Sequence, residues 1–182
     1  MAFTQQQIEN IQIDYGIVFV NYGETDQVQL GPTRGGGTFN VTKNIREIEF
    51  DGRKGKTKGL QVVDEINAQL NVTHLDTSLE TLKLAMPYAE YDDVDKKITC
   101  GGDALGVIPD AAYLKNITMF AKTVKGEYKK ITLYNAMSEN DFSFAAAPKA
   151  EGTIALEVYA HWDAVDDTAD LYDIEDVTSI TP

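Results

Sequence analysis

The sequence predicts a mainly β protein: an antiparallel β-sandwich or partial barrel with one short flanking α-helix, a projecting hairpin loop and extended terminal arms. Two segments, residues 66–73 and 153–162, alternate apolar and polar residues with the period of a half-buried strand. Turn residues such as Gly, Asp and Pro separate six to eight strand-like segments. The helix and strand segments do not alternate as βαβ units do, so the strands are expected to pair antiparallel.

The N-terminal part is expected to form an arm followed by two strands. Residues 1–13 are polar with three interspersed isoleucines, which predicts an arm that becomes ordered only against another surface. Residues 16–22 are β-branched and aromatic, as in a strand buried on both faces. Residues 27–30 form a shorter candidate strand, which ends at Gly31 and Pro32.

Two long strands and the loop between them predict a projecting hairpin. The alternation that starts at Thr38 predicts a strand over 38–50, with a bulge where the phase slips near Ile45 and Arg46. The second strand is expected over 61–74. The connecting loop is too polar to pack, and it consists of Asp51, Gly52, Arg53, Lys54, Gly55, Lys56, Thr57, Lys58 and Gly59.

One helix is expected after the hairpin. Asp76 or Thr77 can cap it, Glu80 follows Thr77 at capping-box spacing, and Pro87 ends it. Further strands are expected at 97–99, 113–122, 128–136 and 153–162. The chain is therefore interpreted as a single domain with an N-terminal arm (1–13), a β-sandwich (14–162) and an acidic C-terminal tail (163–182).

The charge of the chain is uneven. It has 16 basic and 29 acidic residues and a net charge of −13, which argues against binding nucleic acid through its phosphates. Residues 151–182 hold nine acids and no Lys or Arg, whereas six basic residues fall within 43–58. These opposite charges could steer copies of the chain together, or the two segments could be solvated independently.

No catalytic, metal or cofactor site is evident, so we expect no enzyme and no cofactor. Gly55-Lys56-Thr57 resembles the end of a P-loop, but the first glycine of that motif would fall at Phe50, and a strand follows. One cysteine and two histidines are too few for a zinc site. No apolar stretch approaches the ~18 residues of a transmembrane helix, so no membrane partner is expected.

The central part of the chain resembles a known family. Gly-Gly-Gly-Thr-Phe at 35–39, Ile-Glu-Phe-Asp-Gly at 48–52, Lys-Gly at 58–59, Glu-Ile-Asn-Ala-Gln-Leu at 65–70 and Leu-Asp-Thr-Ser-Leu-Glu-Thr-Leu at 75–82 are similar, in this order, to the major tail tube proteins of long-tailed bacteriophages. The resemblance covers about fifty residues.

This resemblance implies that six copies form a ring and that rings stack into a tube whose inner β-barrel lines a channel for DNA. The loop 51–59 and the terminal arms would bind neighbouring copies. The channel wall would carry the polar residues of strands 38–50 and 61–74, namely Asn40, Thr42, Asn44, Glu47, Glu65, Asn67, Gln69 and Asn71. Lys43 and Arg46 depart from a neutral or acidic wall and are expected to pair with acids or to face a neighbour.

The same resemblance implies the partners and the location. The chain would bind itself and other tail proteins, such as the tape measure, the tail terminator and the baseplate or tail tip. DNA would pass without specific binding. The protein would be made in the bacterial host cytoplasm and reside in the virion tail, and both contractile and non-contractile tails fit.

A second hypothesis is a binding module of a tail fibre or surface protein that recognises carbohydrate or a receptor. It rests on aromatic residues that could form a platform. These are Tyr113, Tyr128, Tyr134, Tyr159 and Trp162.

Overall fold

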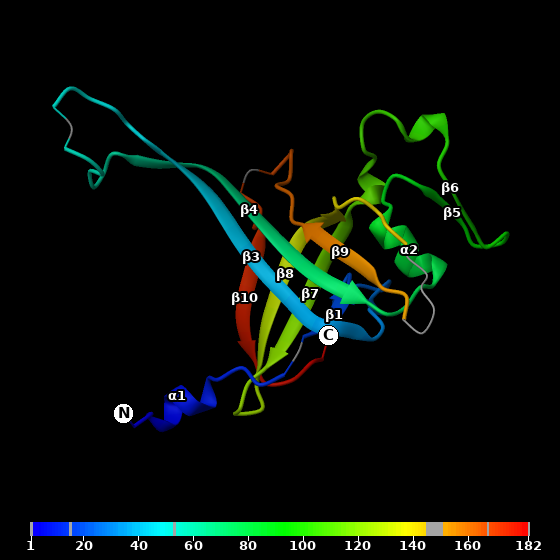
Figure 1. Cartoon of the computed structure of the whole chain (residues 1–182), viewed down its shortest axis with the longest axis horizontal. Coiled ribbons are helices and arrows are strands. Elements are labelled where there is room, and N and C mark those ends of the chain that lie inside the picture. Colours follow the sequence, from blue (N-terminus) through cyan, green and yellow to red (C-terminus); the bar gives the residue numbers. More distant parts are fainter. Residues whose placement is uncertain (1, 15, 53, 145–150, 167, 182) are drawn as a thin grey trace.

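Antiparallel pairing joins most strands into one sheet, which confirms the predicted fold class. The computed structural model describes residues 2–14, 16–52, 54–144, 151–166 and 168–181. The eight-stranded sheet has the order β2-β1-β7-β8-β9-β4-β3, with β10 paired to β8 (Figure 1). Its strands are β1 (Ile17–Val20), β2 (Val28–Gln29), β3 (Thr33–Glu47), β4 (Gln61–His74), β7 (Leu114–Lys122), β8 (Tyr128–Ser138), β9 (Ile154–Tyr159) and β10 (Tyr172–Val177).

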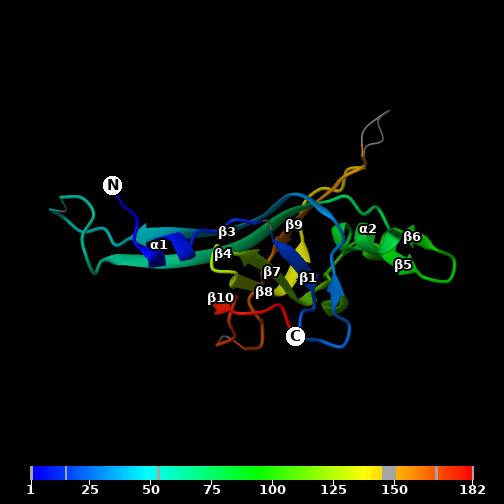
Figure 2. The same cartoon turned by 90° about the horizontal axis from the view of Figure 1, so that it is seen from below.

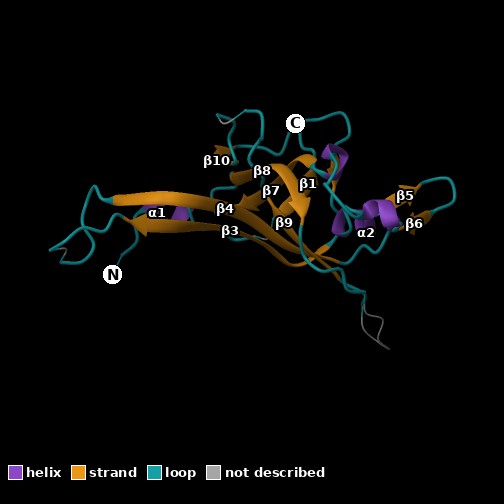
Figure 3. Cartoon of the chain, turned by 90° about the horizontal axis from the view of Figure 1, so that it is seen from above, coloured by secondary structure: helices purple, strands orange, loops and turns teal. Residues whose placement is uncertain are grey.

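A smaller unit lies at one end of this sheet (Figure 3). It contains helix α2 (Leu79–Ala85), the two-stranded sheet of β5 (Glu90–Asp92) and β6 (Lys97–Thr99), and two 3-10 turns, η1 (Gly102–Ala104) and η2 (Asp110–Ala112). The sequence predicted β6 at these bounds, but β5 was missed because Asp92 and Asp93 are typical of a loop. A second helix, α1 (Gln5–Glu9), belongs to the N-terminal arm.

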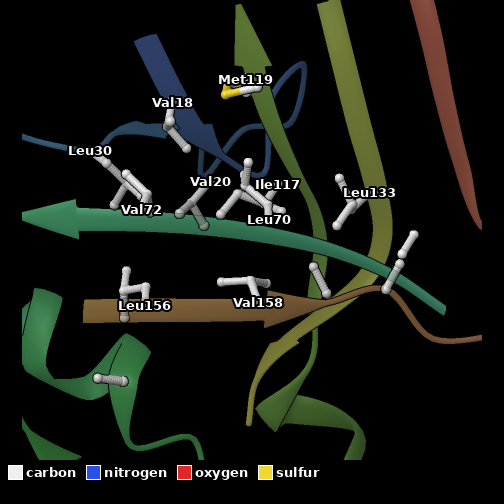
Figure 4. Packing of buried hydrophobic residues seen from close by; sticks show 14 of the residues in the cluster. Val18, Val20, Leu30, Leu70, Val72, Ile117, Met119, Leu133, Leu156 and Val158 are labelled. Atoms are coloured by element: carbon white, nitrogen blue, oxygen red, sulfur yellow. The ribbon is translucent and has the colours of Figure 1, made fainter. Parts of the chain in front are cut away.

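The main sheet folds over on itself because β8 changes direction at Asn135, whose φ is 46°. β8 pairs with β10 only before this residue and with β7 as far as Ala136, and then Met137 and Ser138 pair with β9. The result is two layers with the apolar core between them (Figure 4). Buried residues of one layer are Leu70, Val72, Leu156 and Val158; those of the other are Val18, Val20, Ile117, Met119 and Leu133.

The N-cap of helix α2 lies directly after the two predicted candidates, Asp76 and Thr77. Ser78, not Thr77, is the N-cap, and its hydroxyl accepts from the Thr81 N–H at 3.4 Å. Asp76 supports the cap, since Oδ1 accepts from the Ser78 N–H at 2.9 Å. The hydrogen bond from the Ser78 N–H, followed by those from the Ser78 and Thr81 hydroxyls, lowers the pKa of Asp76.

The N-terminal arm is ordered against the chain's own β7–β8 turn. Ile13 N–H donates to the Lys122 carbonyl at 3.0 Å, and Val124 N–H donates to the Ile11 carbonyl at 2.8 Å. The helix α1 in front of this contact has a complete capping box between Thr4 and Gln7.

The C-terminal segment departs from the prediction of an acidic tail. Residues 172–177 form β10, which pairs along the first half of β8. Its acids lie opposite basic residues of β8: Glu175 pairs with Lys130 at 3.5 Å, and Asp176 pairs with Lys129. The acidic composition suggested a solvated tail because the complementary strand is more than forty residues away in sequence.

Candidate functional site

The hairpin of β3 and β4 extends far beyond the two-layered body (Figure 2). In β4, alternate residues from Ala68 to His74 are buried, but every residue from Gln61 to Glu65 is exposed. In β3, the residues from Asn40 to Arg46 are likewise exposed. The distal half of the hairpin, residues 40–47 and 61–67, is therefore a two-stranded ribbon without cover on either face, and we call it the ribbon.

One face of the hairpin gathers the polar residues that the sequence placed on the channel wall. Directly opposed residues in an antiparallel pair share a face. The register opposes Asn40 to Gln69, Thr42 to Asn67, Asn44 to Glu65 and Thr38 to Asn71. We call this the polar face; it holds Asn40, Thr42, Asn44, Glu65, Asn67, Gln69 and Asn71.

Hydrogen bonds link side chains along the polar face. The Asn67 amide donates to Glu65 Oε1 at 2.9 Å, and the Gln69 amide donates to Asn71 Oδ1 at 2.8 Å. The Gln69 amide also reaches Glu157 Oε2 at 3.3 Å, which extends the face onto β9. Sequence reasoning left Glu157 out because the pairing of β9 with β4 cannot be read from alternation. The alternation of Glu157 with buried Leu156 and Val158 did place it outward.

Glu47 does not belong to the polar face. The alternation of β3 runs unbroken from Gly37 to Glu47, so Glu47 lies on the same side as Phe39 and Val41. Its cross-strand neighbour there is Gln61, whose side-chain amide donates to Glu47 Oε1 at 3.4 Å. The predicted phase slip suggested the opposite side, whereas the extra residue of the bulge is Asp64 in β4.

Lys43 and Arg46 of β3 are kept from acting as free cations on the polar face. Lys43 alternates onto the opposite face, where it lies across from Ile66. Arg46 does lie on the polar side, but Nε and Nη2 bind the Asp64 carboxylate at 2.9 and 3.2 Å. This two-point ion pair confirms that Arg46 pairs with an acid and leaves the polar face neutral to acidic.

The opposite face of the ribbon is mainly apolar and exposed, apart from Lys43 and the Glu47–Gln61 pair. Val41, Ile45 and Val63 continue the row of the partly buried Phe39 and the buried Leu70 outward, with 41%, 42% and 51% of their surfaces exposed. A two-stranded ribbon is marginally stable alone in water, and contiguous exposed apolar surface marks a contact site. The ribbon therefore combines a polar face with an opposite face whose apolar side chains are exposed.

The loop at the end of the ribbon spans residues 48–60, three residues more on its first side than predicted. The Ile48 N–H donates to the Leu60 carbonyl at 2.9 Å, and the Thr57 hydroxyl donates to the Gly55 carbonyl at 3.1 Å. Gly52, Gly55 and Gly59 have positive φ, which suits residues without a Cβ.

This loop presents a cluster of positive charge. Lys54, Lys56 and Lys58 are exposed, and within the described ranges none of the three forms an ion pair. Asp51 and Gly52 are exposed beside them, while Arg53 lies outside the described residues. We call residues 50–58 the basic tip. The sequence predicted its position and charge, but not how far the ribbon carries it from the body.

The aromatic residues of the second hypothesis are not brought together. Tyr113 packs edge-on against His161, Tyr128 packs against Phe120, and the Tyr134 hydroxyl donates to Asp173 Oδ2 at 2.5 Å. No ring contact among the described residues joins two of Tyr113, Tyr128, Tyr134, Tyr159 and Trp162. They therefore provide no shared platform for a sugar ring.

Two titratable groups are strongly affected by the fold. His74 is fully buried, and neither ring nitrogen has a partner among the described residues. Burial lowers the pKa of His74, and nearby Asp76 opposes this effect. Burial and the hydrogen bond to Asp173 raise the pKa of Tyr134 far above its ordinary value. Both groups lie away from the ribbon.

Three further findings concern ligands and similarity. Across the described ranges, no three His, Cys, Asp or Glu side chains lie close enough to hold a metal ion. None of the helices in the described part of the chain has the length and apolar character to cross a bilayer. No protein-family model matches the chain, and no curated protein matches it.

Proposed function

We propose that this chain is the major tail tube protein of a bacteriophage or phage-like particle, a structural subunit and not an enzyme. The observation that carries the proposal is the ribbon with its two unlike faces. Its apolar face exposes Val41, Ile45 and Val63, so the ribbon suits a chain whose neighbours cover it. In a polymer of identical copies, every ribbon is covered in the same way.

The polar face then lines the channel. Its side chains are amides, a hydroxyl and carboxylates, and several of them are hydrogen-bonded to one another. The single guanidinium of this face is held by Asp64, so phosphates meet no free cation there. A neutral to acidic wall repels DNA weakly and binds it nowhere, which favours rapid transit.

Stacked hexameric rings of the chain would form the tube of a virion tail assembled in the bacterial host cytoplasm. The partners would be other copies of the chain, the tape measure inside the tube during assembly, the terminator at one end, and the baseplate or tail tip at the other. DNA would pass through the channel without specific binding. The acidic net charge of −13 keeps free subunits soluble and apart until specific contacts join them.

Deletion of residues 51–59 tests this function. The deletion joins Phe50 to Leu60 and leaves four residues between β3 and β4, a length that antiparallel hairpins accept. We expect a folded monomer, because the removed residues are outside the core, and no tubes. Circular dichroism and thermal unfolding check the fold, and electron microscopy alongside wild-type protein checks assembly. A deletion variant that polymerises like the wild type would show that assembly does not need the loop.

A further inference from the structure

A large open pocket lies in the smaller unit, at the end of the molecule opposite to the basic tip. It has a volume of about 740 Å³ and lies between the β5–β6 hairpin, the residues after α2, and the segment with η1 and η2. This volume is within the range of about 300–1,000 Å³ that accommodates a drug-sized ligand or a few side chains.

Among the charged residues that line this pocket, five carboxylates outnumber two lysines. The carboxylates belong to Glu90, Asp92, Asp93, Asp95 and Asp103, and we call it the acidic pocket. Among them only Asp93 forms an ion pair with a described residue, Lys96 at 2.5 Å. Of the two lysines in the lining, Lys83 donates to the Pro87 and Ala89 carbonyls at 2.9 and 2.6 Å, so its ammonium group is held by the backbone.

The same pocket offers apolar surface beside the carboxylates. Tyr88, Val107 and Ile108 line it with exposed fractions of 49%, 97% and 43%. Leu105, in the same loop as Val107, is also almost fully exposed. Apolar side chains that are exposed next to one another mark a contact surface. A fitting occupant therefore carries positive charge next to apolar side chains.

The basic tip has this composition. Lys54, Lys56 and Lys58 are exposed and form no ion pair with a described residue, and Phe50 at the base of the tip exposes 48% of its surface. The tip and the acidic pocket lie at opposite ends of the longest axis of the molecule (Figure 1), so they cannot meet within one chain. Two copies, however, can place one tip in the other's pocket.

We propose that the basic tip of one copy docks into the acidic pocket of a second copy. This inference rests on the proposed function, because it names the surface that receives the tip in the assembled tube. The contact joins two different surfaces of identical chains, so each docked copy still offers a free tip or a free pocket. Such head-to-tail contacts build closed rings or open-ended stacks and do not stop at a dimer.

Disulfide trapping between full-length chains tests the docking. One variant carries K56C in the tip, and its partner carries D95C at the pocket; both also carry C100S, because Cys100 is exposed beside the pocket. The matched control replaces D95C by D170C, a change of another exposed aspartate on the body. The equimolar mixtures are oxidised mildly, and the 56–95 and 56–170 heterodimers are quantified by mass spectrometry.

We expect roughly tenfold or more 56–95 than 56–170 heterodimer, because docking raises the effective concentration of the two thiols toward the millimolar range. The yield should return to the control level when the pocket variant also carries E90K and D103K. Equal yields of the two heterodimers would overturn the docking even if the wild type forms tubes. A preferred 56–95 heterodimer from a protein that forms no tubes would instead leave the docking in place and overturn the tail tube function.

Discussion

A short hydrogen bond between Tyr134 and Asp173 holds the last strand of the sheet. The Tyr134 hydroxyl donates to one carboxylate oxygen of Asp173 at 2.5 Å, and the other oxygen is buried without a partner among the described residues. The remaining links between β8 and β10 side chains are exposed ion pairs, which contribute little to stability. Removal of this hydroxyl should therefore destabilise β10 more than the rest of the sheet.

Tyr134→Phe is expected to lower the free energy of unfolding by about 1–3 kcal/mol, because it leaves a partly buried carboxylate without a donor. Urea denaturation measures this loss, and the rate of amide hydrogen exchange should increase most in β10. Tyr172→Phe is the control, since the ring of Tyr172 packs on Phe39 and its hydroxyl forms no hydrogen bond with a described residue. Equal losses in the two variants would refute the role of Tyr134.

His74 makes the body sensitive to acid. Its folded-state pKa is lowered below 6.5 by burial, with Asp76 as the opposing charge. Neutral His74 therefore makes its full contribution to the free energy of unfolding above about pH 6.5. This contribution is lost as the pH falls from 6.5 toward the folded-state pKa, and the total loss is about 1.4 kcal/mol for each unit by which the fold lowers the pKa.

Between pH 7 and pH 5, the free energy of unfolding of the His74→Leu variant should fall less than that of the wild type. Urea denaturation at each pH measures both values. Parallel curves for the wild type and His74→Leu would show that His74 does not carry the acid sensitivity.

The hairpin shows which elements can be predicted from sequence. β4 was predicted at its observed bounds, because alternating residues such as Ala68, Leu70 and Val72 mark a strand packed on one face. β3 begins five residues before its prediction, at Thr33. Gly37 pairs with Val72, and the register shift before it contains Gly35 and Gly36, which both have positive φ.

The bulge at Asp64 is the element that directs the ribbon. One extra residue bends a strand and increases its twist, while the pairs on both sides, Asn44 with Glu65 and Ile45 with Val63, stay on their own faces. Deleting Asp64 would join these pairs into a regular ladder. The basic tip would then point in a different direction from the body, while the same residues would remain on each face of the ribbon.

Deletion of Asp64 is expected to leave the free energy of unfolding within about 1 kcal/mol of the wild type, because only an exposed ion pair is lost. Assembly, followed by sedimentation, should fail or need a much higher protein concentration. Asp64→Asn keeps the bulge and weakens the ion pair, so it should assemble nearly as the wild type does. Normal assembly of the deletion variant would contradict the bulge's role in aiming the tip.

At the scale of the whole molecule, opposite features lie at opposite ends. The ribbon carries positive charge to one end, and the smaller unit places carboxylates at the other (Figure 3). The sequence predicted the basic loop and the fold class, because both depend on local patterns. It could not predict the acidic pocket or the strand β10, since each depends on residues that only the folded chain brings together.

The central claim is that copies of this chain assemble into a hollow tube. Electron microscopy of the purified wild-type protein, over a series of increasing concentrations, tests it most directly. We predict stacked rings or tubes of uniform width with a continuous central channel. Only single-chain particles at every concentration, or filaments without a channel, would contradict the claim.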